Sequence, residues 1–89
     1  MPESNNSSAE TLRGSGLRAT PTRRAVIDVL RATNSHMTAS EIIRNLNATK
    51  KTFDQSTVYR VLSDLSRVGL IAESRMSPGD TVFEWISQS

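Results

Sequence analysis

The clearest hydrophobic pattern in the chain covers residues 54–68. Its apolar positions fall three or four residues apart, at Val58, Val61, Leu62, Leu65 and Val68. Asp54 can accept hydrogen bonds from the first exposed amides of a helix, and Gly69 is a typical residue just past a helix end. Because the positions between the apolar residues are polar, the pattern predicts a helix with one face in the core and one toward solvent.

A second helix is predicted over residues 20–31. Thr20 followed by Pro21 is a typical helix start, since the threonine side chain can accept an exposed amide and proline suits the first turn. The apolar stripe of this helix is Val26, Val29 and Leu30, with Ala25 beside it. A short helix over residues 11–15, ended by glycines, is expected before it.

A third helix is predicted from a capping box. Thr38 and Glu41 have the spacing at which each side chain binds the other's exposed backbone amide. The apolar face of this helix is Ile42, Ile43 and Leu46. Residues 47–53 show no helical period and are expected to form a loop.

After Gly69 the helical period gives way to an extended pattern. Residues 70–73 and 81–86 are predicted strands, and Pro78 with Gly79 between them suits a tight reversal. Helices followed by a β-hairpin predict a mainly α member of the α+β class. The expected fold is a winged helix-turn-helix, with three to four helices and a two-stranded wing.

The chain of 89 residues has room for one domain. We expect a disordered polar tail at residues 1–10, the winged-helix domain at 11–86 and a short C-terminal end at 87–89. The chain has no cysteine, and its N-terminus lacks the apolar stretch of a signal peptide or membrane span. A cytoplasmic location without a membrane partner is therefore expected. A single histidine without cysteine or paired carboxylates offers no nucleophile and base, so an enzyme is not expected.

The net charge of +2 says little about partners, but its distribution says more. Residues 13–31 contain five arginines and a single acid, Asp28. Such a run can be a solvated helix face, and it can also neutralise the phosphates of nucleic acid. The candidate DNA contacts outside the 54–68 helix are Arg18, Arg23, Lys50 and Lys51.

The polar face of the 54–68 helix carries the donors that a DNA-reading helix needs. Near its N-terminal end stand Gln55, Ser56, Thr57, Tyr59 and Arg60. Arginine commonly pairs with guanine O6 and N7, and tyrosine can contact thymine methyl groups or phosphates. Two alternatives stay open: Tyr59 as a half-buried packing residue, and the whole helix as a docking surface for another protein.

Four strings of the sequence, in this order, resemble the ferric uptake regulator (Fur) family. They are GLRATPTR at residues 16–23, HMTA at 36–39, STVYRVL at 56–62 and VFE at 82–84. The resemblance implies a metal-dependent repressor that binds A·T-rich palindromic operators in double-stranded DNA as a homodimer. It also implies that Tyr59 and Arg60 read the major groove and that Arg18 probes the minor groove.

The resemblance further implies that His36 and Glu84 are two ligands of a regulatory metal site. Fur-type proteins continue past Val-Phe-Glu into a dimerisation domain with most of the metal ligands, so this chain is expected to be an excised domain or a natural truncation. No cofactor is expected in this chain alone, and zinc or iron(II) in a full-length relative. The segment before Thr38 is expected to pair with the wing and bring His36 and Glu84 together. Their alternative role is that of ordinary surface residues.

Overall fold

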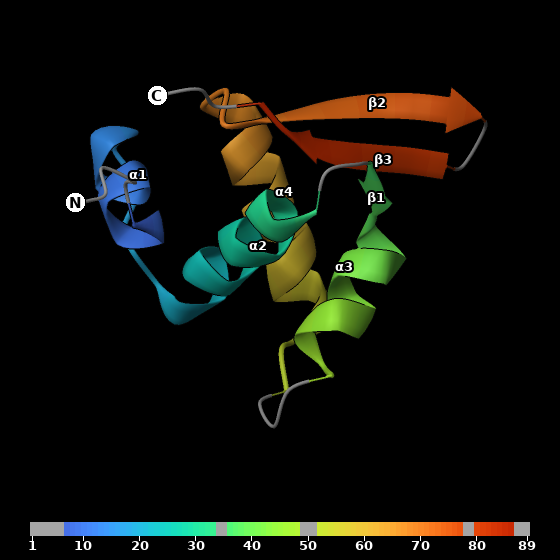
Figure 1. Cartoon of the computed structure of the whole chain (residues 1–89), viewed down its shortest axis with the longest axis horizontal. Helices are drawn as coiled ribbons and strands as arrows, with labels where there is room; N and C mark the ends of the chain where they lie inside the picture. The colour runs from blue at the N-terminus through green and yellow to red at the C-terminus, as the bar shows by residue number, and fades with distance from the viewer. Residues whose placement is uncertain (1–6, 34–35, 49–51, 78–79, 87–89) are drawn as a thin grey trace.

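The computed structural model describes residues 7–33, 36–48, 52–77 and 80–86. Within these residues, four helices and a small antiparallel sheet make one layer of helices under a β-hairpin (Figure 1). The helices are α1 (Ser8–Gly14), α2 (Pro21–Ala32), α3 (Ala39–Leu46) and α4 (Gln55–Arg67). The strands are β1 (Met37–Thr38), β2 (Ile71–Ser77) and β3 (Asp80–Trp85).

The predicted caps start α2 and α3. Thr20 Oγ1 accepts a hydrogen bond from the backbone N–H of Arg23 at 3.2 Å. Thr38 Oγ1 accepts from the N–H of Glu41 at 3.1 Å, and Glu41 Oε1 accepts from the N–H of Thr38 at 2.9 Å. These bonds satisfy amides that have no partner inside their helix, so the helix starts follow directly from the local sequence.

The first helix begins earlier than predicted. Ser7 Oγ accepts from the N–H of Glu10 and Glu10 Oε1 accepts from the N–H of Ser7, each at 3.2 Å, so a second capping box starts α1 at Ser8. The prediction of a disordered tail through residue 10 is therefore wrong for residues 8–10. The fully buried side chain of Leu12 anchors this helix on the core, and Gly16, at φ +84°, takes the chain out of it.

The sheet has the strand order β1-β3-β2. β2 and β3 form the predicted hairpin, entered through Gly69 at φ +83°. The short strand β1 adds to the other edge of β3, with Met37 opposite Phe83 and Thr38 opposite Val82. The segment before α3 therefore pairs with the wing, as expected, and the sheet has three strands in place of the two predicted for the wing.

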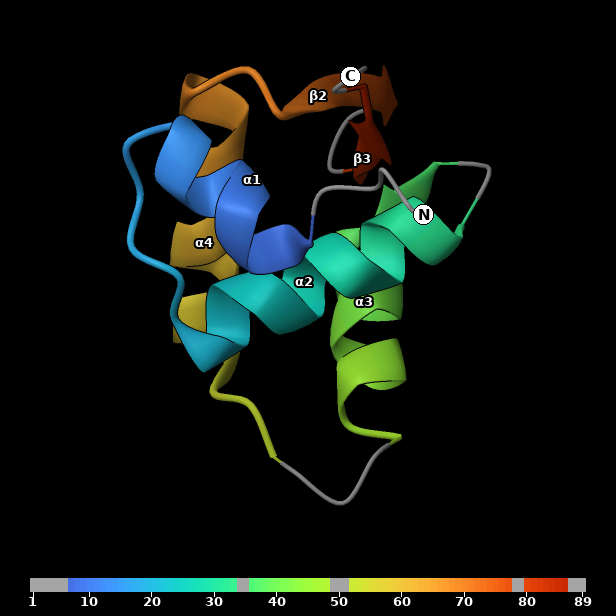
Figure 2. The same cartoon turned by 60° about the vertical axis from the view of Figure 1, so that its left-hand side comes forward.

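The core lies where α2 crosses α3 and α4. Figure 2 shows α1 in front of α2, on which it packs, and the hairpin above the helices, where β2 packs on α4. The largest side chains that are completely or almost completely buried are Leu12, Val26, Ile27, Leu30, Ile42, Val58, Leu62, Leu65 and Ile71. Burial of aliphatic side chains of this size stabilises a fold by roughly 1.5–3 kcal/mol each.

The predicted fold class is confirmed: the chain is a mainly helical, α+β winged helix-turn-helix. In the described part of the chain, no helix is long and apolar enough to cross a membrane.

Candidate nucleic-acid interface

The two faces of α4 separate as the pattern predicted. Val58, Leu62 and Leu65 are at most 1% exposed and face the core. The opposite face is exposed and consists of Gln55, Ser56, Thr57, Tyr59, Arg60 and Ser63. The structure thus brings the predicted α4 residues to one accessible surface of a helix that is firmly anchored on its other side.

Tyr59 is not part of the core. Its relative exposure of 45% is the highest among the large hydrophobic residues of the described chain. The packing role considered for this side chain therefore has no support, and both its ring and its hydroxyl are accessible. Arg60, the next residue, is exposed as well.

The N-terminal end of α4 is organised by Asp54. Its Oδ2 accepts hydrogen bonds from the hydroxyl of Ser56, from the N–H of Thr57 at 3.1 Å and from the hydroxyl of Thr57 at 3.2 Å. The Ser56 hydroxyl first, and then the Thr57 groups, hold the pKa of the Asp54 carboxyl below its usual 3.8. Both hydroxyl hydrogens are thus engaged in the free protein, which leaves their oxygens as acceptors toward a DNA base.

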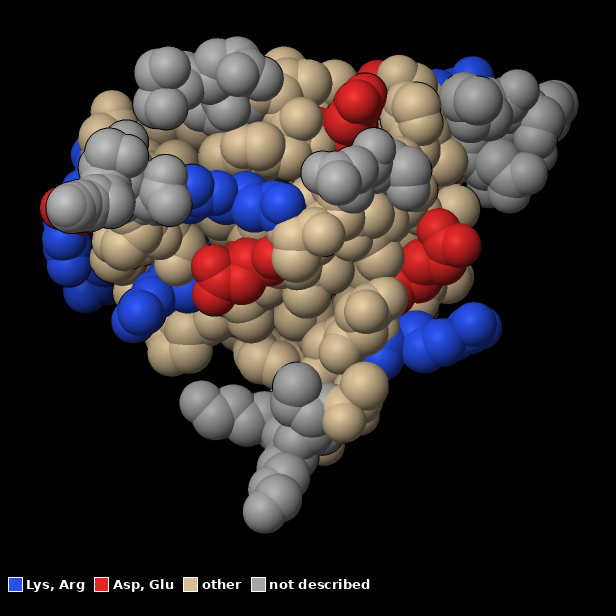
Figure 3. All heavy atoms as spheres, viewed as in Figure 1, with Lys and Arg blue, Asp and Glu red and all other residues tan. Residues whose placement is uncertain are grey.

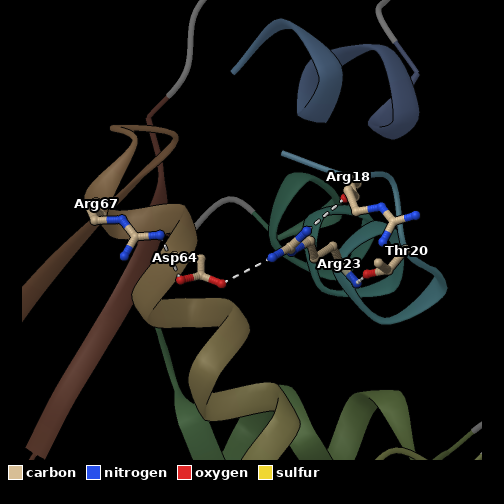
Figure 4. Close-up of polar contacts among 5 residues, drawn as sticks. All are labelled: Arg18, Thr20, Arg23, Asp64 and Arg67. Carbon is tan, nitrogen blue, oxygen red and sulfur yellow. Dashed lines mark hydrogen bonds and ion pairs between the residues drawn. The ribbon is translucent and has the colours of Figure 1, made fainter. Parts of the chain in front are cut away.

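Arg18 and Arg23 differ in their surroundings (Figure 4). The Arg18 side chain is exposed on the segment between α1 and α2. The Arg23 side chain turns inward: Nη1 donates to the carbonyl oxygen of Arg18 at 3.1 Å, and Nη2 lies 3.2 Å from Oδ2 of Asp64 on α4. The predicted phosphate contact of Arg23 does not fit this placement well, since its guanidinium is only 20% exposed and is already engaged within the domain.

Asp64 is the functional candidate that the sequence pattern missed. Its second oxygen, Oδ1, accepts from Nη2 of Arg67 at 3.0 Å, so one carboxylate joins two arginines. It is separated from Arg23 by 41 residues, and no local spacing signals such a contact. The sequence signal that could have identified Asp64 is that it is an acidic residue on a helix whose other polar positions are mostly hydrogen-bond donors.

The distribution of charge over the surface indicates a DNA-binding face less clearly than these individual contacts do. The face of the molecule in Figure 3 carries basic and acidic side chains side by side, with basic side chains gathered toward the end where α1 lies. Lys50 and Lys51, the predicted phosphate contacts in the loop before α4, lie outside the described residues.

The wing brings His36 and Glu84 together. Because Met37 pairs with Phe83, the residues that precede Met37 and follow Phe83 lie opposite each other across the two strands. Nε2 of His36 is 3.2 Å from Oε1 of Glu84, and the two side chains are 48% and 46% exposed. Among the described residues, no group of three or more His, Cys, Asp or Glu side chains could hold a metal ion.

Comparison with known proteins gives this site its context. The model of the ferric uptake regulator family matches residues 14–89. The chain belongs to this family. Its Fur relatives include the ferric uptake regulation protein of Bordetella parapertussis, 34% identical over 74 residues, which cover 82% of this chain and 53% of that protein. The peroxide-responsive repressor of Staphylococcus saprophyticus is 30% identical over 78 residues, or 88% of this chain and 53% of that protein. This Fur-family chain therefore spans about half the length of the curated relatives it matches.

Solved structures of Fur proteins share the fold. The ferric uptake regulator of Pseudomonas aeruginosa with manganese superposes with a TM-score of 0.83 at 28% identity, over 90% of this chain and 60% of that one. The Vibrio cholerae ferric uptake regulator gives 0.81 at 29% identity, over 88% and 60% of the two chains. The names of these relatives are those of regulators and repressors, in agreement with the expectation that the chain is not an enzyme.

Proposed function

We propose that this domain binds double-stranded DNA in a sequence-specific way, as the DNA-reading part of a metal-responsive transcriptional repressor. The observation that carries the proposal is α4, a helix with a fully buried apolar face and an exposed face of hydrogen-bonding side chains. A helix of this kind can enter the major groove with its N-terminal residues against base edges. The Vibrio cholerae relative is described as having DNA-binding domains, which supports the same reading.

The contacts follow from exposure and chemistry. Arg60 would donate to guanine O6 and N7, and Tyr59 would contact a thymine methyl group or a phosphate. Gln55, Ser56 and Thr57 lie at the N-terminal end of α4, which would meet the bases first. Arg18 would enter an adjacent minor groove, where A·T-rich sequence narrows the groove and strengthens its negative potential. Lys50 and Lys51 would contact phosphates.

The operator would be A·T-rich and palindromic, and two copies of the chain would bind its two half-sites. A palindrome matches a two-fold symmetric dimer, in which each α4 reads one half. Because the aligned residues span only about half of the length of these relatives, dimerisation is assigned to a longer protein or to assembly on the DNA. The work of such a repressor would take place in the cytoplasm of a bacterial cell.

His36 and Glu84 fit a regulatory zinc or iron(II) ion as two of its ligands. Imidazole nitrogen and carboxylate oxygen are donors that both ions accept, and a separation of 3.2 Å lets one ion reach both. Two ligands leave the site incomplete in this domain. In a longer protein, an ion bound by these two side chains and by ligands from elsewhere would fix the angle between two such domains.

The alternative is that α4 docks another protein and does not read DNA. Salt dependence distinguishes the two, because contacts to phosphates release counterions and lose affinity steeply as salt rises. The test is a fluorescence anisotropy titration with an A·T-rich palindromic duplex and with a scrambled duplex, at 50 and at 200 mM salt. Preference for the palindrome with a steep salt slope supports the proposal, whereas equal and salt-insensitive binding refutes it.

A further inference from the structure

The contacts of Arg23 and Asp64 have no role in the proposed base readout, yet they join the two segments that would carry it. We propose that Arg23 is a positioning residue, which holds the backbone at Arg18 in a fixed place relative to α4 through Asp64. This inference rests on the proposed function only for its consequence in DNA binding. The positioning itself is a property of the free protein.

The segment that carries Arg18 is held at both of its ends. At its start, the N–H of Leu17 donates to the carbonyl oxygen of Leu12 in α1 at 2.9 Å. At its end, the backbone N–H of Arg23 binds Thr20 Oγ1. Between them, the Arg18 side chain is exposed, so its direction is set by the backbone that bears it.

Arg23 supplies the contact that links this backbone to α4. The carbonyl oxygen of Arg18 accepts from the N–H of Thr20 at 3.0 Å and from Nη1 of Arg23 at 3.1 Å. The other terminal nitrogen of the same planar guanidinium reaches Asp64 (Figure 4). An arginine is suited to this role because its donors have a fixed geometry, so that one anchored nitrogen orients the other.

Asp64 lies on the correct part of α4 for such a link. It follows Arg60 by four residues, so the two side chains are neighbours along one side of the helix. Its carboxylate is 15% exposed and bonded through both oxygens, to Arg23 and to Arg67. The backbone that carries Arg18 is therefore linked through Arg23 to Asp64, one helical turn after Arg60 on α4.

The consequence is a coupling between minor-groove and major-groove recognition. A flexible arm loses conformational freedom when it is ordered on DNA, and this cost reduces its contribution to selectivity. With the arm already in place, replacing A·T by G·C under it should weaken the wild-type complex by about tenfold. Without Arg23, this factor should fall toward one, although Arg18 itself is unchanged.

The test compares the wild type with Arg23→Met, which keeps the aliphatic length and removes the donors. Arg24→Met is the matched control, because Arg24 is the exposed next residue of the same helix and the same charge is lost. Asp64→Asn removes the negative charge that pairs with Arg23, with little change in shape. If Arg23 and Asp64 act as one unit, the double variant Arg23→Met/Asp64→Asn should lose no more A·T selectivity than either single variant.

Two measurements separate positioning from DNA binding and from general stability. In the free protein, ¹⁵N relaxation should give Arg18 and Ala19 order parameters of about 0.85 in the wild type and Arg24→Met, and below about 0.6 in Arg23→Met and Asp64→Asn. On DNA, A·T selectivity should fall in these last two variants while the preference at the bases read by α4 is kept. An ordered arm with unchanged A·T selectivity in folded Arg23→Met or Asp64→Asn overturns the proposal. A wild type that lacks selectivity for any duplex overturns the proposed function alone, since the relaxation result still decides the positioning.

Discussion

Nε2 of His36 lies 3.2 Å from Oε1 of Glu84, across the β1–β3 pair that joins the start of α3 to the wing. Two residues separated by more than half of the chain thus form the contact that the resemblance to Fur proteins implied. The arrangement offers an ion two ligands, one from β3 and one from the residue just before β1. Its exposed position lets an ion approach from solvent.

Zinc should bind this pair weakly, because two protein ligands leave the other positions of a tetrahedral site to water. A zinc titration followed by the His36 ring signals in NMR should show a shift that saturates only at high metal concentration. Glu84→Gln should reduce the shift, and Glu73→Gln, a carboxylate on the neighbouring strand, should leave it unchanged. Tight one-to-one binding, or no change at His36 at millimolar zinc, would contradict the two-ligand site.

The buried face of α4 should dominate the stability of the domain. Leu65 is 0% exposed, so Leu65→Ala should lower the free energy of unfolding by about 2–5 kcal/mol through lost burial and a remaining cavity. Ile86 is 42% exposed, and Ile86→Ala should change the free energy of unfolding by less than about 0.5 kcal/mol. Urea denaturation of both variants measures the difference, and similar values for the two would refute the assigned core.

The carboxyl of Asp54 should titrate at lower pH in the folded protein than in the unfolded chain. Hydrogen bonds from Ser56 and Thr57 favour its charged form and lower its pKa. The stability it contributes is therefore present above the unfolded pKa of about 3.8 and is lost as pH falls through the lower, folded value. Asp54→Ser keeps a capping oxygen but cannot ionise.

The stability difference between wild type and Asp54→Ser should accordingly shrink as pH falls from about 5 to 2. Urea denaturation at several pH values measures this difference, and NMR of the Asp54 carboxyl carbon reports its pKa directly. A pKa at or above 3.8 in the folded protein would show that the cap does not act through the charged form.

Local signals predicted most of the fold. The caps at Thr20, Thr38 and Asp54 and the stop at Gly69 determine helix ends through bonds to nearby residues, and the structure has them where the sequence placed them. The start of α1 was missed although Ser7 and Glu10 form the same kind of capping box, because the polar composition of residues 1–10 suggested a tail. Composition was here a poorer guide than spacing.

Contacts between distant segments could be predicted only in part. The approach of His36 to Glu84 was expected, because the segment before α3 commonly pairs with the wing in a winged helix. The link between Arg23 and Asp64 depends on how α2 crosses α4, and no periodicity in either helix encodes that crossing. Arg23 was consequently expected to face phosphate, although the structure turns its guanidinium toward α4.

The exposed face of α4 is proposed to read bases, and a substitution of Arg60 is the sharpest test of this role. Replacing Arg60 by Ala should weaken binding to the preferred duplex by about 1–3 kcal/mol and relax the base preference at one operator position. Arg44→Ala, which removes an exposed arginine from α3, should keep the base preference of the wild type. The measurement is the affinity of each protein for the A·T-rich palindrome and for its single-position variants. We expect Arg60→Ala alone to lose the preference at one position, and an unchanged preference at every position would show that Arg60 does not read a base.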